Sequence, residues 1–328
     1  MNPPRLLVPR LVFLLTGIFA AIHSSGQSAL ERVIHLNDSL YASEILLVQE
    51  GKELLYWKDP SCAVTTLGTA SMVKSWTGLA IGTLIDRGLI KSVDEKVCQW
   101  LPEWKDGCRK NVTVRHLLTM TAGFNRRGGA SGILAQDDNN TYVLNTKMDT
   151  VPGIRFGYSN ESVQLLGIIL ERVSGMEADR YFKKYLFEPL GMDNTHLGKD
   201  QSGKNWVTYG GCTSTVSDAA RIGELILGRG RYKGRQVVSE KWIEEMLTPG
   251  TLATYYGYLW WVDHKGKYVT YAAMGDPGVM TIIYPQLDLV FVRNQACENN
   301  TAIQPRYSSA FWFGPGFIQV VGDAAGQH

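Results

Sequence analysis

The sequence of 328 residues lacks several patterns that would assign it to a class of protein at once. Lysine and arginine total 33 against 31 aspartate and glutamate residues, and neither sign is clustered, so the chain carries no electrostatic footprint for nucleic acid. It has no Cys-x-x-Cys pair and no His-Glu-x-x-His segment, which argues against a zinc site. We therefore expect a globular protein that acts on a small-molecule or peptide substrate and needs no cofactor.

The sequence also lacks the Gly-x-Ser-x-Gly segment that presents the nucleophile of α/β-hydrolases. None of its six histidines lies beside such a segment. His116 falls inside an expected helix, where we expect a packed or solvated side chain. The sequence therefore argues against an α/β-hydrolase triad.

The apolar run over residues 11 to 22 is too short to span a bilayer comfortably. It follows Arg5 and Arg10 and precedes the small residues 24 to 26, which is the layout of a secretory signal. We expect residues 1 to 26 to be a signal peptide and the mature protein to be secreted or periplasmic, with no stable membrane span. An uncleaved anchor is the alternative.

Cysteine is scarce, with residues at positions 62, 98, 108, 212 and 297. This number fits an exported protein that has one or two disulfides and at least one free thiol. Cys98 and Cys108 are the best candidate pair, because they bracket a short loop that a disulfide closes easily.

The N-terminal part of the mature chain predicts a hairpin followed by a helix. Two apolar, β-leaning runs, 45–48 and 54–57, flank a polar turn. From Ser71 to Gly88 the apolar residues take helical spacing, and the segment ends in a basic residue and a glycine. Ser71 therefore opens a long buried helix.

The stretch from about 90 to 250 is expected to be mostly helical. Its signals are Thr113 capping 114–120, Asn160 leading into 163–173, a segment 178–186 that stops before Pro189, Ser217 capping a helix through Leu227, and Ser239 capping one through Leu247. Residues 124 to 150, which include Arg126 and Arg127, are polar and long enough to form a binding loop. We expect this loop to line the cleft together with Tyr256, Trp260 and Trp261.

Strand signals return near the C terminus, at 258–262, 268–273, 279–284 and 289–294, before a closing helix over 307–323 that Gly314-Pro315 breaks. The expected fold is α/β (α+β): an antiparallel sheet built from both termini and flanked by helices, with a large all-helical insertion. One domain covers 27–328. Its sheet part takes about 27–70 and 250–328, and its helical part about 71–249.

Three elements carry the chemistry. Ser71 and Lys74 lie one helical turn apart, so the amine can take the proton of a serine nucleophile, although a helix start with a solvated lysine has the same spacing. Tyr158-Ser159-Asn160 precedes a helix, for which Asn160 could also serve as the cap. Gly275-Asp276-Pro277-Gly278 lies between two strands and permits a close approach of the backbone to a ligand.

In this order the three elements resemble the serine β-lactamase and penicillin-binding-protein superfamily, with its Ser-x-x-Lys, Ser/Tyr-x-Asn and Lys-Thr-Gly motifs. With tyrosine and not serine at position 158, the chain is similar to one branch of the superfamily. This branch contains class C β-lactamases, D,D-peptidases, esterases and 6-aminohexanoate-dimer hydrolases. The resemblance implies a β-lactamase/transpeptidase-like fold and acyl transfer through Ser71. It implies that Lys74 and Tyr158 share the proton work, without deciding which is the base.

The resemblance further implies that the backbone amides of Ser71 and Asp276, with Gly275 beside them, form the oxyanion hole, and that Asn160 bonds the substrate amide or Lys74. The chain departs from the pattern at Ala273-Met274-Gly275, where the superfamily's triplet has a cation for the substrate carboxylate. We therefore expect an ester or amide substrate without that carboxylate.

Two alternatives remain open. The first is a β-lactamase or D,D-peptidase whose carboxylate clamp comes from elsewhere, with Arg126 and Arg127 as candidates. The second is a non-catalytic binding protein on the same scaffold. The presence of Ser71, Lys74 and Tyr158 together argues for the enzyme.

Overall fold

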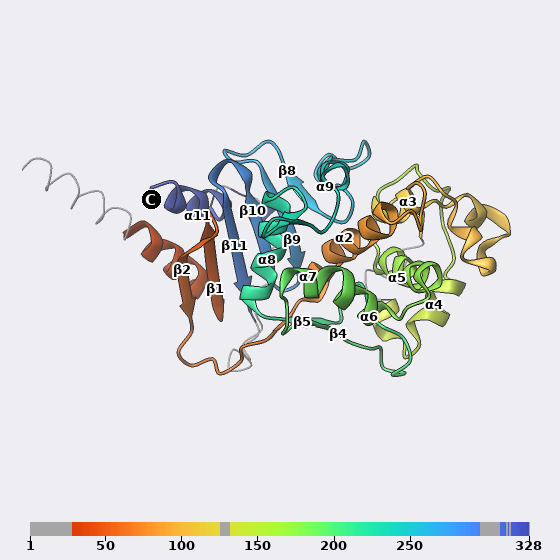
Figure 1. The fold of residues 1–328 in the computed structure, drawn as a ribbon, viewed down its shortest axis with the longest axis horizontal. Helices are drawn as coiled ribbons and strands as arrows, with labels where there is room; N and C mark the ends of the chain where they lie inside the picture. The colour runs from red at the N-terminus through yellow and green to blue at the C-terminus, as the bar shows by residue number, and fades with distance from the viewer. Residues whose placement is uncertain (1–27, 125–131, 296–308, 313, 315, 328) are drawn as a thin grey trace, which may run out of the picture.

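A six-stranded antiparallel sheet joins the two ends of the chain (Figure 1). The computed structural model describes residues 28–124, 132–295, 309–312, 314 and 316–327. The sheet has the order β2-β1-β11-β10-β9-β8 and consists of β1 (Glu44–Gln49), β2 (Lys52–Lys58), β8 (Trp261–Asp263), β9 (Thr270–Gly275), β10 (Val279–Tyr284) and β11 (Leu289–Asn294). Leu46 of β1 is paired with Val292 of β11, so the expected hairpin and its pairing with the C-terminal strands are confirmed.

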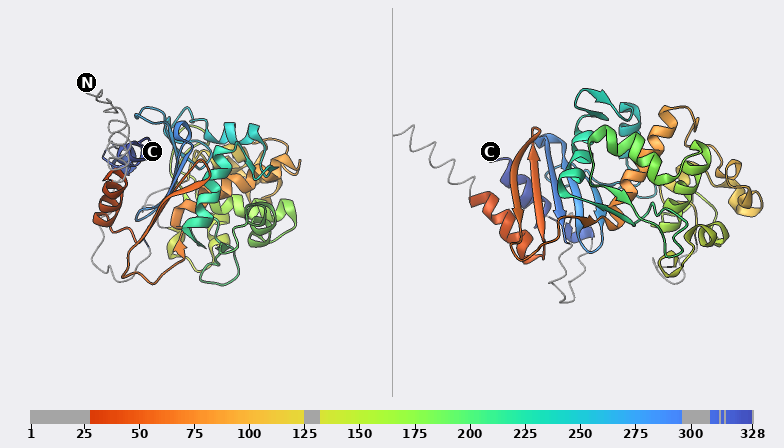
Figure 2. Two further views of the ribbon diagram at one scale, coloured as in Figure 1. Left: turned by 60° about the vertical axis from the view of Figure 1, so that its left-hand side comes forward. Right: turned by 60° about the horizontal axis from the view of Figure 1, so that its bottom comes forward.

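Both faces of the sheet are covered, because its strands alternate their apolar side chains between two cores. In β1, Leu46 belongs to the core shared with the helical part, whereas Ile45 and Leu47 belong to a second core. On the first face lies α8 (Val216–Leu227), and on the second lie the helix over 28–39 and α11 (Ile318–Ala325) (Figure 2). The sheet is therefore a rigid middle layer.

The remaining elements form a largely helical part beside the sheet (Figure 1). Its helices are α2 (Val73–Asp86), α3 (Val114–Leu118), α4 (Asn139–Asn145), α5 (Asn160–Ser174), α6 (Ala178–Phe182), α7 (Glu188–Leu190) and α9 (Glu240–Leu247). Two small sheets accompany them, β3 (Leu67–Gly68) with β5 (Cys212–Ser214) and β4 (His196–Leu197), and β6 (Arg231–Tyr232) with β7 (Arg235–Gln236). The expected mixed fold, with an antiparallel sheet and many helices, is thus confirmed.

Helix α2 connects the two parts. All but the last two of its residues, Ile85 and Asp86, are buried, and it contacts α5, α9 and strand β9. It follows a short 3₁₀ turn over Ala70–Met72, so Ser71 lies in that turn, and the regular helix begins at Val73 and not at Ser71 as expected. This turn contacts both strand β9 and α2, so the nucleophile candidate is held between the sheet and the helical part.

Several expected helix ends are wrong by a residue or more. Helix α8 is capped by the Thr215 hydroxyl, which accepts the Asp218 amide, and not by Ser217. Helix α5 is capped by Ser159, so Asn160 is its first residue. Helical structure does not end before Pro189 as expected. Pro189 lies in the first turn of α7, where the missing N–H of proline costs no helical hydrogen bond.

The expected Cys98–Cys108 disulfide is not formed in this structure. Cys98 is a free cysteine, as is Cys212. The Cys98 thiol lies 3.6 Å from the carbonyl oxygen of Lys110. Loop length made the pairing feasible, but a short loop does not by itself bring two thiols into bonding geometry.

Two predictions fall outside the described residues. The signal peptide over 1–26 is one, and Arg126 with Arg127 in the expected binding loop is the other. Among the described residues, every helix is too short or too polar to cross a bilayer.

Candidate active site

The spacing of Ser71 and Lys74 produces a direct hydrogen bond. Lys74 Nζ donates to Ser71 Oγ at 2.7 Å and to the carbonyl oxygen of Tyr209 at 2.5 Å. Lys74 is 1% exposed, so the interpretation of a solvated lysine is wrong. The second acceptor fixes the ammonium beside the serine hydroxyl.

The environment of Lys74 suits proton transfer at neutral pH. Burial lowers the pKa of Lys74 to about 7, and the charge of Glu161 opposes this shift. The rings of Tyr158 and Tyr209 lie on the amine, with Nζ 5.2 Å and 5.6 Å from their centroids. Near pH 7 a large fraction of Lys74 is therefore neutral and able to accept a proton.

Tyr158 is held by other aromatic rings. It precedes α5 and stacks on Trp261 with ring centroids 5.9 Å apart and planes at 25°, while the buried ring of Tyr256 meets its edge at 6.2 Å. Packing on both partners limits its movement, because each ring restricts the available rotamers. Tyr158 thus faces Lys74 in a fixed position.

Strand β9 approaches the nucleophile closely at Gly275. A Cβ added there would lie 2.4 Å from the carbonyl oxygen of Thr69 and 2.9 Å from the Cβ of Ala70. Only glycine therefore fits where the end of β9 meets the turn before Ser71. The next residue, Asp276, lines the same two cavities as Ser71.

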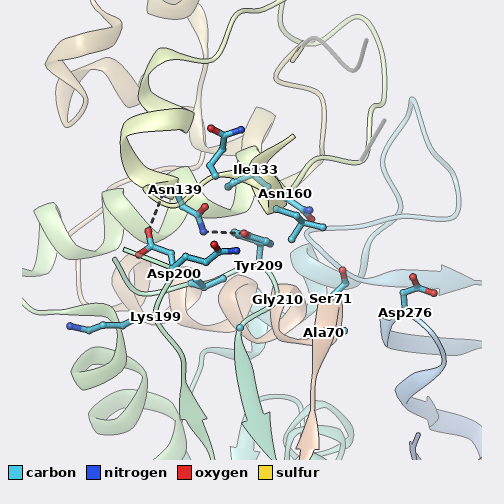
Figure 3. A pocket seen from close by; sticks show the side chains of 15 residues that line it. Ala70, Ser71, Ile133, Asn139, Asn160, Lys199, Asp200, Tyr209, Gly210 and Asp276 are labelled. Carbon is cyan, nitrogen blue, oxygen red and sulfur yellow. Dashed lines mark hydrogen bonds between the residues drawn. The ribbon is translucent and has the colours of Figure 1, made fainter. Parts of the chain in front are cut away.

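Ser71 lies between two cavities. One, of about 440 Å³, is drawn in Figure 3 and is lined by Ala70, Ser71, Ile133, Leu134, Gln136, Asn139, Asn160, Lys199, Asp200, Gln201, Val207, Tyr209, Gly210, Gly211 and Asp276. The other, of about 210 Å³, is lined by Ser71, Tyr158, Trp261, Met274, Gly275, Asp276, Pro277, Gly278 and Trp312. All site residues predicted from the motifs thus line one of the two cavities, except Lys74, which is buried next to Ser71.

Two residues that sequence reasoning missed support Lys74. Tyr209 supplies the carbonyl acceptor, and its hydroxyl is hydrogen-bonded to the side-chain amide of Asn139 at 3.0 Å (Figure 3). The backbone N–H of Asn139 in turn donates to the Asp200 carboxylate at 3.0 Å. The Gly210-Gly211 pair next to Tyr209 was the one local signal, because it marks a tight backbone approach.

Of the aromatic residues expected to line the cleft, one lines a cavity at Ser71 and the others are buried behind it. Trp261 lines the small cavity, whereas Trp260 is fully buried and lines neither cavity at Ser71. Tyr256 is buried behind Tyr158. His116 completes a capping box with Thr113 at the start of α3, which is the structural role expected for it.

The donor set offers no metal centre. Among the described residues, histidine, cysteine, aspartate and glutamate nowhere gather in a group of three that could hold a metal ion. The functional groups at the candidate site are a serine hydroxyl, an amine, a phenol and backbone amides.

Curated proteins of known function include relatives of this chain. A 6-aminohexanoate-dimer hydrolase of Paenarthrobacter ureafaciens is 27% identical over 229 residues, which cover 64% of this chain and 58% of that protein's length. This chain thus spans a little over half of that relative.

Two solved structures show the same fold. A penicillin-binding protein homologue from Pyrococcus abyssi, described as octameric, superposes with a TM-score of 0.66 and 23% identity, covering 82% of this chain and 73% of that one. EstCE1, described as a hydrolase with promiscuous acyltransferase activity, gives a TM-score of 0.70 at 18% identity, covering 92% and 99%. The family described as Beta-lactamase matches residues 45–298. The chain therefore belongs to the β-lactamase family, a family of serine hydrolases.

Proposed function

We propose that the protein hydrolyses an ester or amide through an acyl-enzyme at Ser71. One observation carries the proposal: the Lys74 amine lies 2.7 Å from Ser71 Oγ, is almost fully buried, and has its pKa lowered to about 7. A buried amine of this kind accepts a proton from a serine hydroxyl, which an exposed lysine near pH 7 does not. The relatives named as hydrolases support the same chemistry.

Acylation begins when Ser71 Oγ attacks the substrate carbonyl carbon and its proton passes to neutral Lys74. The backbone amides of Ser71 and Asp276 stabilise the oxyanion. As the bond to the leaving atom breaks, Tyr158 delivers a proton to that atom and is reprotonated from Lys74. Water then attacks the acyl-enzyme, and the same groups move its proton back to Ser71.

The substrate of this proposal is uncharged next to β9. Ala273 is fully buried, and the described residues that line the small cavity include no lysine, arginine or histidine. A carboxylate bound there would lose its hydration without gaining a cationic partner. We therefore place neutral esters and amides ahead of penicillin-like and D-Ala-D-Ala substrates.

The experiment combines active-site labelling with turnover. Wild-type protein is incubated with a fluorophosphonate, its intact mass and labelled peptide are measured, and hydrolysis of 4-nitrophenyl esters and of nitrocefin is followed. We expect one adduct, on Ser71, and turnover of the ester. Ser71→Ala should lose both, while Ser39→Ala, which removes an exposed hydroxyl, should retain them.

Each alternative has its own outcome in this experiment. Efficient nitrocefin turnover that is lost in an Arg126→Ala, Arg127→Ala double variant would replace the proposal by the β-lactamase alternative. Ester hydrolysis that survives in Ser71→Ala, or absence of both label and turnover, would contradict an acyl-enzyme at Ser71. Ligand binding that is equal in wild type and Ser71→Ala, without hydrolysis, would favour the binding protein.

We also propose export. The support is the pattern of residues 1 to 26, with a basic start, a short apolar run and small residues at the end. We expect the mature N terminus near residue 27 in protein recovered outside the cytoplasm. An intact N terminus on the exported protein would favour the anchor instead.

A further inference from the structure

The turn after α3 binds the backbone on both sides of Tyr158. The carbonyl oxygen of Met120 accepts the Gly157 N–H at 2.8 Å, and its sulfur atom, Sδ, accepts the Ser159 N–H at 3.3 Å. Met120 is 1% exposed, so both bonds are shielded from water. One residue therefore holds the chain directly before and directly after the phenol whose ring lies on the Lys74 amine.

The backbone conformation of Met120 follows from the end of α3. The N–H of Thr121 donates to the carbonyl of His116 at 2.8 Å. The N–H of Met120 donates to the carbonyl of Leu117 at 3.2 Å. These two bonds close a helix C terminus through one residue in the left-handed region, and Met120 has a φ of 58°. Glycine is favoured at such a position, because any side chain there is strained.

Three other helices of this chain use glycine in that conformation. Shortly after α2, α5 and α7 come glycines with a positive φ, namely Gly88, Gly175 and Gly191. The end of α3 has a methionine instead, which the closure of the helix does not require. The bond from the Ser159 N–H to Sδ gives that side chain a role, because a buried backbone N–H needs an acceptor and a thioether is able to serve as one.

The Sδ bond joins the end of α3 to the start of α5, two helices that pack against each other. Ser159 caps α5, since its hydroxyl accepts the Ser162 N–H at 3.1 Å, and its own N–H is the group bound to Met120. Tyr158 immediately precedes this cap. Stacking on Trp261 restricts the rotamer of the Tyr158 ring, whereas the two bonds to Met120 determine where its backbone lies.

We propose that Met120 is a positioning residue for Tyr158: its thioether, through the Ser159 N–H, holds the phenol where it passes its proton to the leaving atom and takes the serine proton from Lys74. The inference rests on the proposed function, which gives Tyr158 this task. Leucine has a similar volume but accepts no hydrogen bond, so Met120→Leu removes the acceptor of the Ser159 N–H and keeps the packing. The segment then shifts, and the phenol shifts with it.

The first test is a double-variant cycle with phenyl acetate, whose leaving oxygen is basic enough to need a proton. Met120→Leu should lower kcat/KM about tenfold, because a small misplacement of a reacting group is costly. The same change made in Tyr158→Phe should lower it less than twofold, since the hydroxyl being positioned is already absent. Met246→Leu, at a fully buried methionine of the same core, is the control and should change kcat/KM less than twofold.

The cycle separates failure of the inference from failure of the proposed function. Equal losses from Met120→Leu with and without the Tyr158 hydroxyl, or no loss in either case, overturn the positioning role. If Tyr158→Phe is slow in these cases, the proposed function survives. If Tyr158→Phe is as active as the wild type, the proton delivery by Tyr158 fails and the inference fails with it.

The second test follows the two backbone bonds by amide hydrogen exchange. In the wild type the amides of Gly157 and Ser159 should both be protected. In Met120→Leu the Ser159 amide should exchange at least tenfold faster, whereas the Gly157 amide, whose acceptor is the retained carbonyl of residue 120, should change less than threefold. Equal changes at both amides would contradict a specific role of Sδ. An unprotected Ser159 amide in the wild type would overturn the inference even if the variant does not fold.

Discussion

The candidate active site has two sides that differ in polarity. The helix-borne side, at α2 and the start of α5, presents polar groups to Ser71, whereas the sheet-borne side, at β9, presents mainly apolar ones. Helix α2 and the chain at the start of α5 bring Lys74, Tyr158 and Asn160, whose amine, phenol and amide are all polar. Strand β9 brings a methionine to the wall of the small cavity and, next to it, an alanine that is fully buried. Under the proposed function, reaction type and substrate choice are specified separately, the first by a short helical spacing and the second by single residues on a strand.

The largest effect is expected on the helix-borne side, from Lys74→Met. Removal of the amine removes the proton acceptor of Ser71, so kcat/KM for 4-nitrophenyl acetate should fall by about 10³, within the usual range for a lost acid–base group. Thermal unfolding should show a folded protein, since methionine fills a similar volume. Lys91→Met, at an exposed position, is the control. A loss below tenfold would remove Lys74 from the proton path.

On the sheet-borne side, Gly275→Ala should act through the backbone. Its new methyl group would lie 2.4 Å from the Thr69 carbonyl oxygen, so β9 has to move away from the turn that carries Ser71. We expect a loss of about 10² in kcat, as for a lost oxyanion donor. Gly68→Ala is the matched control, because nothing lies within 4 Å of its added Cβ. Equal activity in both variants would mean that the close contact of Gly275 with the turn before Ser71 is not needed for activity.

Tyr158→Phe keeps the ring and removes only the hydroxyl. Because the stacking on Trp261 is retained, the variant isolates proton delivery, and kcat/KM should fall by about 10². Tyr255→Phe, whose ring also stacks on Trp261, should change activity less than twofold. If the two variants behave alike, Tyr158 acts by packing and not by proton transfer.

The pH dependence follows from the pKa of Lys74, which burial lowers to about 7. The amine must be neutral to accept a proton, so kcat/KM should rise with pH, about tenfold per unit below pH 7, and level off above it. A profile of kcat/KM in the wild type measures this. A flat profile between pH 5 and 9 would contradict Lys74 as the base.

The smallest effect concerns Tyr209. Replacement by leucine removes a ring 5.6 Å from Lys74 Nζ but keeps the backbone carbonyl that accepts a hydrogen bond from this amine. Loss of a cation–π contact worth about 1 kcal/mol disfavours the ammonium, so the rising limb of the pH profile should move about 0.7 units lower. Tyr209→Phe, which keeps the ring, should move it less. An upward shift in Tyr209→Leu would contradict the argument.

The sequence predicted the parts of this molecule that local periodicity determines. The hairpin of β1 and β2, the helix behind Ser71 and the i, i+3 spacing of Ser71 and Lys74 need only neighbouring residues to be recognised. Tyr209 and Asn139 could not be found in this way, because they reach Lys74 only through tertiary contacts across more than 60 residues of sequence.

The wall of the small cavity shows the same limit. Ala273 was recognised as a missing cation, but no pattern in the chain shows that Met274, Trp261 and Trp312 meet beside it. The Cys98 prediction failed for a related reason, since loop length permits a disulfide but the tertiary geometry of both cysteines, which the sequence does not show, decides whether one forms.

The most direct measurement is a rapid-quench reaction of the wild-type protein with 4-nitrophenyl acetate at pH 7, followed by peptide mapping of the trapped intermediate. We expect one acetyl group, on Ser71, that forms with the nitrophenol burst and decays at the steady-state rate. Nitrophenol release with the acetyl group on another residue, or with no acetyl-enzyme while Ser71→Ala still turns over, would contradict the nucleophilic role of Ser71.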